Sequence, residues 1–176
     1  MKKESRMITG NIFLIGFMGT GKSTAARELK KMLHMECMEM DDMIVERQGM
    51  PISQIFQKFG EAFFRDLETG LLVELKGKKN MIVSCGGGAV LRPENIGHMK
   101  ESGKVVLLSA TPQTVYGRVK NSTNRPVLNG NMNVEYIQEL MEKRREKYEK
   151  AADIVIVTDG KTTGQVCDEI IRALEI

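Results

Sequence analysis

The chain has 176 residues, of which 41% are hydrophobic and 28% are charged. This composition is ordinary for a globular protein and argues against intrinsic disorder. The 26 basic and 23 acidic side chains leave a net charge of +3, which is too balanced for a nucleic-acid-binding surface. A chain of this length buries about 70% of its unfolded surface on folding, so we expect one stable domain over residues 1–176 without metal or disulfide bonds.

The sequence also argues against export and membrane insertion. The apolar segment 12–18 is far shorter than the roughly 20 residues that span a bilayer, and it continues into a glycine-rich loop rather than a cleavage site. The three cysteines, Cys37, Cys85 and Cys167, are widely spaced, which is typical of reduced thiols and gives no zinc-binding pattern. We therefore expect a cytoplasmic monomer with neither a membrane nor a nucleic acid as partner.

Along the chain, short apolar runs alternate with segments of helical periodicity. Apolar runs bounded by glycine or polar residues predict strands, and apolar residues three or four positions apart predict helices. In chain order we expect a strand over 11–15, a helix over 23–34, a weaker strand over 36–40, a helix over 61–77, strands over 81–85 and 105–109, helices over 112–120 and 133–149, a strand over 154–157 and a helix over 163–175. This alternation predicts an α/β fold, namely a three-layer α/β/α sandwich around a central, mainly parallel five-stranded sheet.

The strongest motif is the segment 16–23, GFMGTGKS, which matches G-x-x-x-x-G-K-[ST]. It lies between a predicted strand and a predicted helix, and this context distinguishes a phosphate-binding loop (P-loop) from a chance glycine turn. Backbone N–H groups and the helix N-terminus of such a loop surround the phosphates of ATP or GTP. Lys22 is expected to reach the β- and γ-phosphates, and the Ser23 hydroxyl to bind Mg²⁺. The residues expected at the nucleotide are Gly19, Thr20, Gly21, Lys22, Ser23 and Thr24.

An acidic segment, Glu39-Met-Asp41-Asp42, follows the weak strand 36–40. It would lie at the carboxyl edge of the sheet, where ligands bind in open α/β folds. Carboxylates there could hold Mg²⁺ through water or accept a proton from a hydroxyl group. Asp41 and Asp42 are equally suited to the start of a helix, where acidic side chains are favourable. The sequence leaves both interpretations open.

Three consecutive glycines, Gly86, Gly87 and Gly88, follow the strand predicted over 81–85. Each costs backbone entropy worth roughly 0.5–1 kcal/mol relative to alanine in regular structure. A run of three favours a close approach of another group to the backbone, with a flexible turn as the alternative.

Two arginines have informative positions. Arg144 shares the apolar face of the predicted helix 133–149, whereas Arg145 lies on the opposite face, and an inward guanidinium needs an anion. Arg65 follows Glu61 by four residues and precedes Glu68 by three, so a surface ion pair is an alternative for it. If both arginines converge, they could hold a carboxylate through bidentate hydrogen bonds.

Taken together, the motifs resemble those of the shikimate kinase family. In chain order they are G-x-x-G-x-G-K-S, an acidic pair before I-x-E-R-x-G, F-R-x-x-E, C-G-G-G-A-V, N-R-P-V-L and K-R-x-x-x-Y, and they cover nearly the whole chain. The resemblance implies a P-loop NTPase fold and an enzyme that uses ATP to phosphorylate the 3-hydroxyl of shikimate, with Mg²⁺ as cofactor. ATP and shikimate are the implied partners.

The resemblance also implies roles for individual residues. Arg65 and Arg144 would hold the carboxylate of shikimate, with Asp41 on its ring hydroxyls and Gly86, Gly87 and Gly88 beside it. Lys22, Asp41 and Arg125 would be catalytic, and Arg125 would belong to a lid over about 121–133. Arg118 would stack on adenine, opposite the loop that carries Lys161. Phe56 and Phe64 would wall the pocket, with core packing as the alternative.

The chain departs from the family at one position. The family pattern D-x-D reads Glu39-Met-Asp41 here, so Glu39 falls on the metal side and Asp41 on the substrate side. A glutamate can still bind Mg²⁺ through water, and Asp42 could take its place.

Two other functions agree with part of this pattern. A P-loop kinase for gluconate or a nucleoside monophosphate would share the phosphate loop, but GGGAV with Arg65 and Arg144 favours shikimate. A non-catalytic nucleotide switch would have no reason to retain all five of Lys22, Ser23, Asp41, Arg125 and Arg144.

Overall fold

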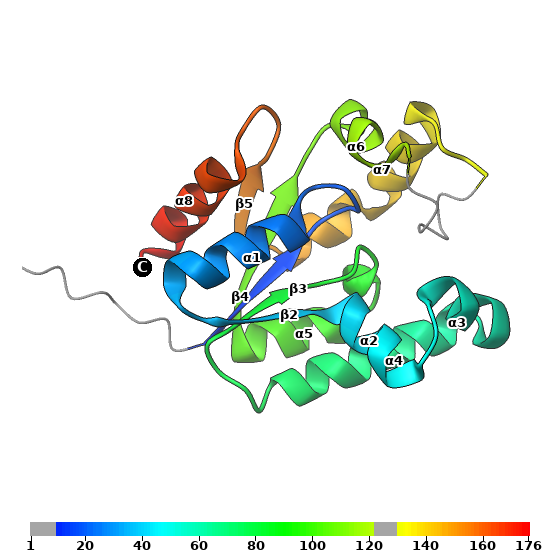
Figure 1. Ribbon diagram of the computed structural model, residues 1–176, viewed down its shortest axis with the longest axis horizontal. Helices are drawn as coiled ribbons and strands as arrows, with labels where there is room; N and C mark the ends of the chain where they lie inside the picture. Colours follow the sequence, from blue (N-terminus) through cyan, green and yellow to red (C-terminus); the bar gives the residue numbers. More distant parts are fainter. Residues whose placement is uncertain (1–9, 122–129) are drawn as a thin grey trace, which may run out of the picture.

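The computed structural model describes residues 10–121 and 130–176, which form a sheet between two layers of helices (Figure 1). The five strands lie in the order β2-β3-β1-β4-β5, and each neighbouring pair is parallel. Their bounds are β1 Asn11–Ile15, β2 Glu36–Glu39, β3 Met81–Ser84, β4 Gly103–Ser109 and β5 Ile154–Val157. The helices are α1 Lys22–Leu33, α2 Met40–Gln48, α3 Ile52–Phe59, α4 Glu61–Leu75, α5 Pro93–Ser102, α6 Pro112–Val119, α7 Val134–Ala151 and α8 Thr163–Leu174, with a 3₁₀ turn, η1, at Ala89–Leu91.

The predicted α/β/α sandwich is confirmed, and the predicted strands agree with the observed ones to within two residues. Three helices and the 3₁₀ turn were not predicted. Helix α2 has nine residues and little apolar periodicity. Helix α3 has apolar residues at helical spacing, Ile52, Ile55, Phe56 and Phe59, but its eight residues make only about two turns, and sequence reasoning missed it. Helix α5 has only two buried residues, Asn95 and Met99, and its sequence therefore looks like a polar loop.

The strand side chains alternate between two cores, as the pleat of a strand requires. Ile12 and Leu14 pack in the core that α1 and α8 cover. Phe13 and Ile15 point to the opposite face and belong to the core that they form with helices α2 to α7. Both faces of a parallel sheet are therefore buried, and burial of each such side chain stabilises the fold by about 1.5–3 kcal/mol.

The topology positions a site at the carboxyl ends of β1 and β3. After β1 the chain enters the P-loop and then α1 on one face of the sheet, whereas after β3 it passes through η1 to α5 on the other. Ligands in open α/β sheets bind in the crevice that such a divergence leaves. The P-loop turns through left-handed backbone at Gly16, Gly19 and Gly21, and a Cβ at Gly16 would lie 2.9 Å from the Thr20 hydroxyl. Within the described ranges, every helix is too short or too polar to span a bilayer.

Candidate active site

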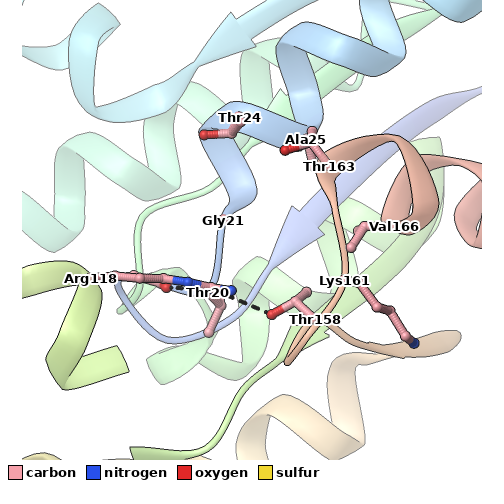
Figure 2. Close-up of a pocket in the computed structure, with 10 residues that line it drawn as sticks. Thr20, Gly21, Thr24, Ala25, Arg118, Thr158, Lys161, Thr163 and Val166 are labelled. Carbon is pink, nitrogen blue, oxygen red and sulfur yellow. Dashed lines mark hydrogen bonds between the residues drawn. The ribbon is translucent and has the colours of Figure 1, made fainter. Parts of the chain in front are cut away.

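One cavity, of about 200 Å³, lies between the P-loop, α6 and the loop that joins β5 to α8 (Figure 2). Six residues expected at the nucleotide line it, namely Gly19, Thr20, Gly21, Thr24, Arg118 and Lys161. Sequence reasoning did not single out the other four, Ala25, Thr158, Thr163 and Val166, because small or apolar residues carry no signal of their own. Only the tertiary structure brings the β5–α8 loop to the P-loop.

Arg118 crosses this cavity and connects its walls. Its Nη1 donates hydrogen bonds to the carbonyl of Gly19 (3.0 Å) and to the hydroxyl of Thr158 (3.4 Å), as Figure 2 shows. Lys161 lines the cavity, but its side chain extends away from the P-loop in Figure 2, and its Nζ lies 2.9 Å from a carboxylate oxygen of Glu169.

Asp159, in the loop that joins β5 to α8, is hydrogen-bonded to the start of α6. Its carboxylate accepts hydrogen bonds from the Thr114 hydroxyl (2.6 Å) and the Thr111 backbone N–H (3.1 Å). Although partial burial acts to raise the pKa of Asp159, these hydrogen bonds hold it below its usual value. The loop after β5 is thereby joined to the start of α6, the helix that carries Arg118.

A second cavity, of about 180 Å³, lies on the other side of the P-loop and shares Gly19, Gly21 and Thr24 with the first. Its lining includes six residues expected in the site, namely Lys22, Ser23, Glu39, Asp41, Gly86 and Gly87. It also includes Met18, Ser84 and Cys85. A phosphate chain that enters from the first cavity along the P-loop would therefore end among these groups.

Lys22 and Cys85 show how this second cavity is buried. Lys22 is 8% exposed, and its Nζ donates to the carbonyls of Gly16 (2.8 Å) and Phe17 (3.0 Å). Burial raises the pKa of the Cys85 thiol well above its usual range, so the thiol stays protonated and is unsuited to act as a nucleophile.

The acidic segment after β2 divides between the cavity and the solvent. Asp41 and Asp42 both lie in the first turn of α2, as the helix-start interpretation expected, yet Asp41 also lines the cavity whereas Asp42 is exposed. Neighbouring positions on a helix point about 100° apart, so only one of the two can face the site. Glu39 ends β2 and is half-buried. Its pKa is raised by burial, with the nearby Ser84 and Ser23 hydroxyls acting in the opposite direction.

Arg65 is buried and already paired within its own helix. Its Nη1 donates to Glu68 (2.7 Å), and its Nη2 donates to Glu61 (2.9 Å). The ion-pair alternative is thus observed, but Arg65 is only 8% exposed and its pair with Glu68 lies in the interior, whereas Glu61 is at the surface. The guanidinium carbon also lies 5.2 Å from the centroid of the Phe64 ring.

Arg144 projects from α7 toward the glycine run 86–88. It is 6% exposed, and its guanidinium carbon lies 5.8 Å from the centroid of the Phe17 ring. Four residues further along α7, the Tyr148 hydroxyl donates a hydrogen bond to the carbonyl of Gly87. The expectation that Arg144 faces inward and Arg145 outward is confirmed, because Arg145 is exposed.

Each of the three consecutive glycines lies against a different charged group. A Cβ on Gly86 would meet Asp41 Oδ1 (2.8 Å) and Glu68 Oε2 (2.9 Å). On Gly87 it would lie 3.6 Å from Arg144 Nη1, and on Gly88 it would lie 2.5 Å from Arg65 Cζ. The glycine run therefore provides the close approach that its sequence suggested, and it brings two guanidinium groups and two carboxylates around one stretch of backbone.

Sequence reasoning treated Glu68 only as a surface partner of Arg65. The structure instead buries Glu68 completely, and within the described residues its Oε2 has no hydrogen-bond partner. Burial raises the pKa of Glu68 to about 7, although the Arg65 ion pair acts to lower it. The i, i+3 spacing predicted the pairing, but spacing along a helix does not reveal which face is buried.

The stability of the fold should report this shift. At about pH 6 the folded chain keeps the Glu68 proton that the unfolded chain has released, so stability falls as the pH rises from about 5 to about 8. Relative to Glu68→Gln, which has no proton to lose at this position, the wild type should lose on the order of 3 kcal/mol of its free energy of unfolding over that range. Urea denaturation at a series of pH values measures this. Glu74→Gln is the control, because Glu74 is exposed and its pKa is lowered by Arg47, which places its titration below this range. Parallel profiles for Glu68→Gln and wild type would contradict the assignment.

Two expectations are not addressed by these contacts. Arg125 lies outside the described residues, as does most of the predicted loop 121–133. Phe56 and Phe64 pack against each other with ring centroids 5.2 Å apart, and neither lines the two cavities.

Comparison with known proteins agrees with this geometry. The sequence profile of the family described as shikimate kinase matches residues 18–175. A shikimate kinase of Thermodesulfovibrio yellowstonii is 42% identical over 165 residues, which is 94% of this chain and 95% of that protein. The structure of a shikimate kinase from Acinetobacter baumannii in complex with shikimate superposes with a TM-score of 0.91 at 31% identity, covering 95% of this chain and 93% of the other.

A gluconokinase from Sinorhizobium meliloti is also similar, with a TM-score of 0.59 over 97% of this chain and 94% of the other. Its identity is only 14%, so this likeness shows the fold alone. The profile match and the 42% identity, by contrast, extend over almost the whole sequence. The chain belongs to the shikimate kinase family.

Proposed function

We propose that this chain transfers the γ-phosphate of ATP to the 3-hydroxyl of shikimate, with Lys22, Asp41 and Arg125 as the catalytic residues. The observation that supports it most is the glycine run, which faces two buried guanidinium groups beside the P-loop. Arg65 and Arg144 would bind the substrate carboxylate through charge-assisted hydrogen bonds. Gly86 and Gly87 line the second cavity and would let the substrate ring approach the backbone, whereas Gly88 leaves room for the Arg65 guanidinium. Such an enzyme would act as a monomer in the cytoplasm.

Phosphoryl transfer requires in-line placement and neutralisation of charge more than covalent chemistry from the protein. The buried Lys22 ammonium would neutralise charge on the phosphate oxygens, helped by Arg125, which the resemblance alone assigns. Asp41, at the start of α2, would orient the 3-hydroxyl and accept its proton late in the transfer. Arg118 and the loop that carries Lys161 would hold adenine in the first cavity.

The residues beside the P-loop fit a magnesium ion. Ser23 and Glu39 line the same cavity, and a hydroxyl with a carboxylate and several waters is a typical Mg²⁺ environment. When bound, Mg²⁺ would neutralise charge on the β- and γ-phosphates. Asp42 is the weaker candidate, because it is exposed and does not line the cavity.

Magnesium dependence should therefore separate the two acidic residues. Glu39→Gln is expected to raise the Mg²⁺ concentration for half-maximal activity by about tenfold, because loss of a residue that binds a metal through water typically weakens metal affinity by about that factor. Asp42→Asn is the matched control and should leave it unchanged. Magnesium titrations of turnover at fixed ATP measure both values. If only Asp42→Asn shifts the curve, the metal assignment is wrong.

The glycine run offers a direct test of the substrate site. Gly88 has a φ of −97°, so alanine is compatible with its backbone, but the added Cβ would displace the Arg65 guanidinium. Gly88→Ala should raise the KM for shikimate about 10- to 100-fold, the loss expected for a hydrogen bond to a charged group. Gly70→Ala, on the same helix as Arg65 and with no neighbour within 4 Å, is the control. An unchanged KM in Gly88→Ala would remove Arg65 from the substrate site.

The proposed function itself is tested by substrate-dependent release of ADP. We expect turnover with shikimate and at most background hydrolysis with gluconate or AMP as the acceptor. Mass spectrometry of the product should locate the new phosphate on the 3-hydroxyl. Turnover with gluconate and not shikimate would overturn the proposal, and ATP binding without any turnover would favour a nucleotide switch.

A further inference from the structure

A third cavity, of about 380 Å³, lies beside the two that form the candidate active site. It is bounded by one face of α7, the ends of β4 and β5, and Phe17 of the P-loop. Of the described residues assigned above to ATP, shikimate or metal, only Thr20 lines it. Its volume falls within the range of about 300–1,000 Å³ typical of small-molecule sites. The proposed reaction makes no use of this space.

The walls of this third cavity are largely apolar. Leu107 from β4, Met141 from α7 and Val155 from β5 all line it. Val155 is 53% exposed, although it lies on a strand whose next residue, Ile156, is buried in the core. The structure thus leaves apolar sheet surface open here, against which a flat aromatic ring can pack.

The rim of the third cavity carries an excess of negative charge. Glu142, Arg145 and Glu149 project from the outward face of α7 and line it. The Arg145 guanidinium lies 2.7 Å from a Glu142 carboxylate oxygen, so these two charges compensate each other. Glu149 forms no ion pair with any described residue within 4 Å. Among the charged side chains that line the cavity, the Glu149 carboxylate therefore remains uncompensated and favours a cation.

We propose that this third cavity is a separate binding site for a small aromatic amine, with the ring against the apolar wall and the ammonium beside Glu149. Two residues that line it also contact the candidate substrate site. Tyr148 donates its hydroxyl proton to the carbonyl of Gly87, and Phe17 lies under the Arg144 guanidinium. A ligand that restrains Phe17 and Tyr148 changes the groups that hold Gly87 and Arg144, so its binding is coupled to that of shikimate.

Calorimetry with tryptamine as the probe tests the location and the chemistry. The full chain is first saturated with a non-hydrolysable ATP analogue, so that the nucleotide cavity is filled. Tryptamine should then still bind saturably, and indole-3-propionate, with the same ring and opposite charge, should bind at least tenfold more weakly. Loss of tryptamine binding in the presence of the analogue, equal binding of the two probes, or no saturable binding would each overturn the proposal.

The edge strand provides a matched pair of variants. Val155→Trp would fill the cavity, whereas Val157→Trp changes a residue of the same strand that is 49% exposed and does not line it. We expect Val155→Trp to abolish tryptamine binding, and Val157→Trp to preserve both tryptamine binding and turnover. Glu149→Gln should weaken tryptamine about threefold, the effect of one exposed charge. Equal effects of the two tryptophan variants, or no effect of Glu149→Gln, would contradict the site.

Coupling is measured by repeating the tryptamine titration with saturating shikimate. The Kd of tryptamine should change at least twofold, and tryptamine should change the Kd of shikimate by the same factor, because coupling between two sites is reciprocal. Identical Kd values with and without shikimate would overturn the coupling through Phe17 and Tyr148.

Discussion

Replacement of Lys22 by methionine is expected to lower the kcat for shikimate phosphorylation by about 10²- to 10³-fold, the loss typical of one preorganised electrostatic group. Lys22 is buried and lines the second cavity, where the charge of its ammonium is poorly screened by water. Methionine keeps an unbranched apolar chain, one atom shorter, but removes the charge and the hydrogen bonds to Gly16 and Phe17. Steady-state kinetics at saturating ATP and shikimate measure the effect.

The control for this variant lies on the same helix. Lys30 is exposed in α1, and Lys30→Met should leave kcat within about twofold of wild type, as expected for a surface change. Thermal melting of both variants separates loss of catalysis from loss of folding. A folded Lys22→Met variant with nearly normal kcat would exclude the role proposed for this ammonium.

Asp41→Asn should reduce kcat by a similar factor, about 10²- to 10³-fold, while the affinity for ATP changes less than about twofold. Asparagine has nearly the same shape as aspartate, but it cannot take the proton of the 3-hydroxyl. Asp41 lines the second cavity, at the glycine run, whereas adenine is proposed to bind in the first cavity, on the other side of the P-loop. Turnover assays combined with calorimetric titration of an ATP analogue measure the two effects separately.

The neighbouring residue is the natural comparison. Asp42 shares the first turn of α2 and points to solvent, so Asp42→Asn should retain full kcat. If both variants lose the same activity, the first turn of α2 contributes through folding or net charge rather than through a positioned base. A loss of ATP affinity as large as the loss of kcat would likewise remove Asp41 from the proton-accepting role.

The sequence predicted this protein best where one local rule decides the structure. The P-loop combines a strand, a glycine turn and a helix within a short segment, so the motif implies both its conformation and its chemistry. The buried strands were predicted equally well, because both faces of a parallel sheet require apolar side chains. Helices α2, α3 and α5 were missed because each is short and buries only one or two side chains.

The candidate site was predictable in its membership but less so in its electrostatics. Asp41 satisfied two interpretations at once, because the first turn of a helix can also border a cavity. The spacing around Arg65 suggested an ion pair, and the pair exists, but its burial changes its meaning. An ion pair at the surface would contribute about 0–1 kcal/mol to stability and would leave the pKa of Glu68 near its usual value. Burial instead raises that pKa to about 7, so the protonation of Glu68 changes near neutral pH.

The amino-acid sequence by itself determined the α/β/α architecture, the phosphate-binding loop and the family, since these depend on periodicity and on residues that are close along the chain. Tertiary structure alone decided which charged groups meet at the three glycines, how deeply Glu68 is buried, and that an apolar hollow remains between α7 and the end of β5. The physical reason is that burial and electrostatic coupling depend on distances between elements far apart in sequence, which no local pattern encodes.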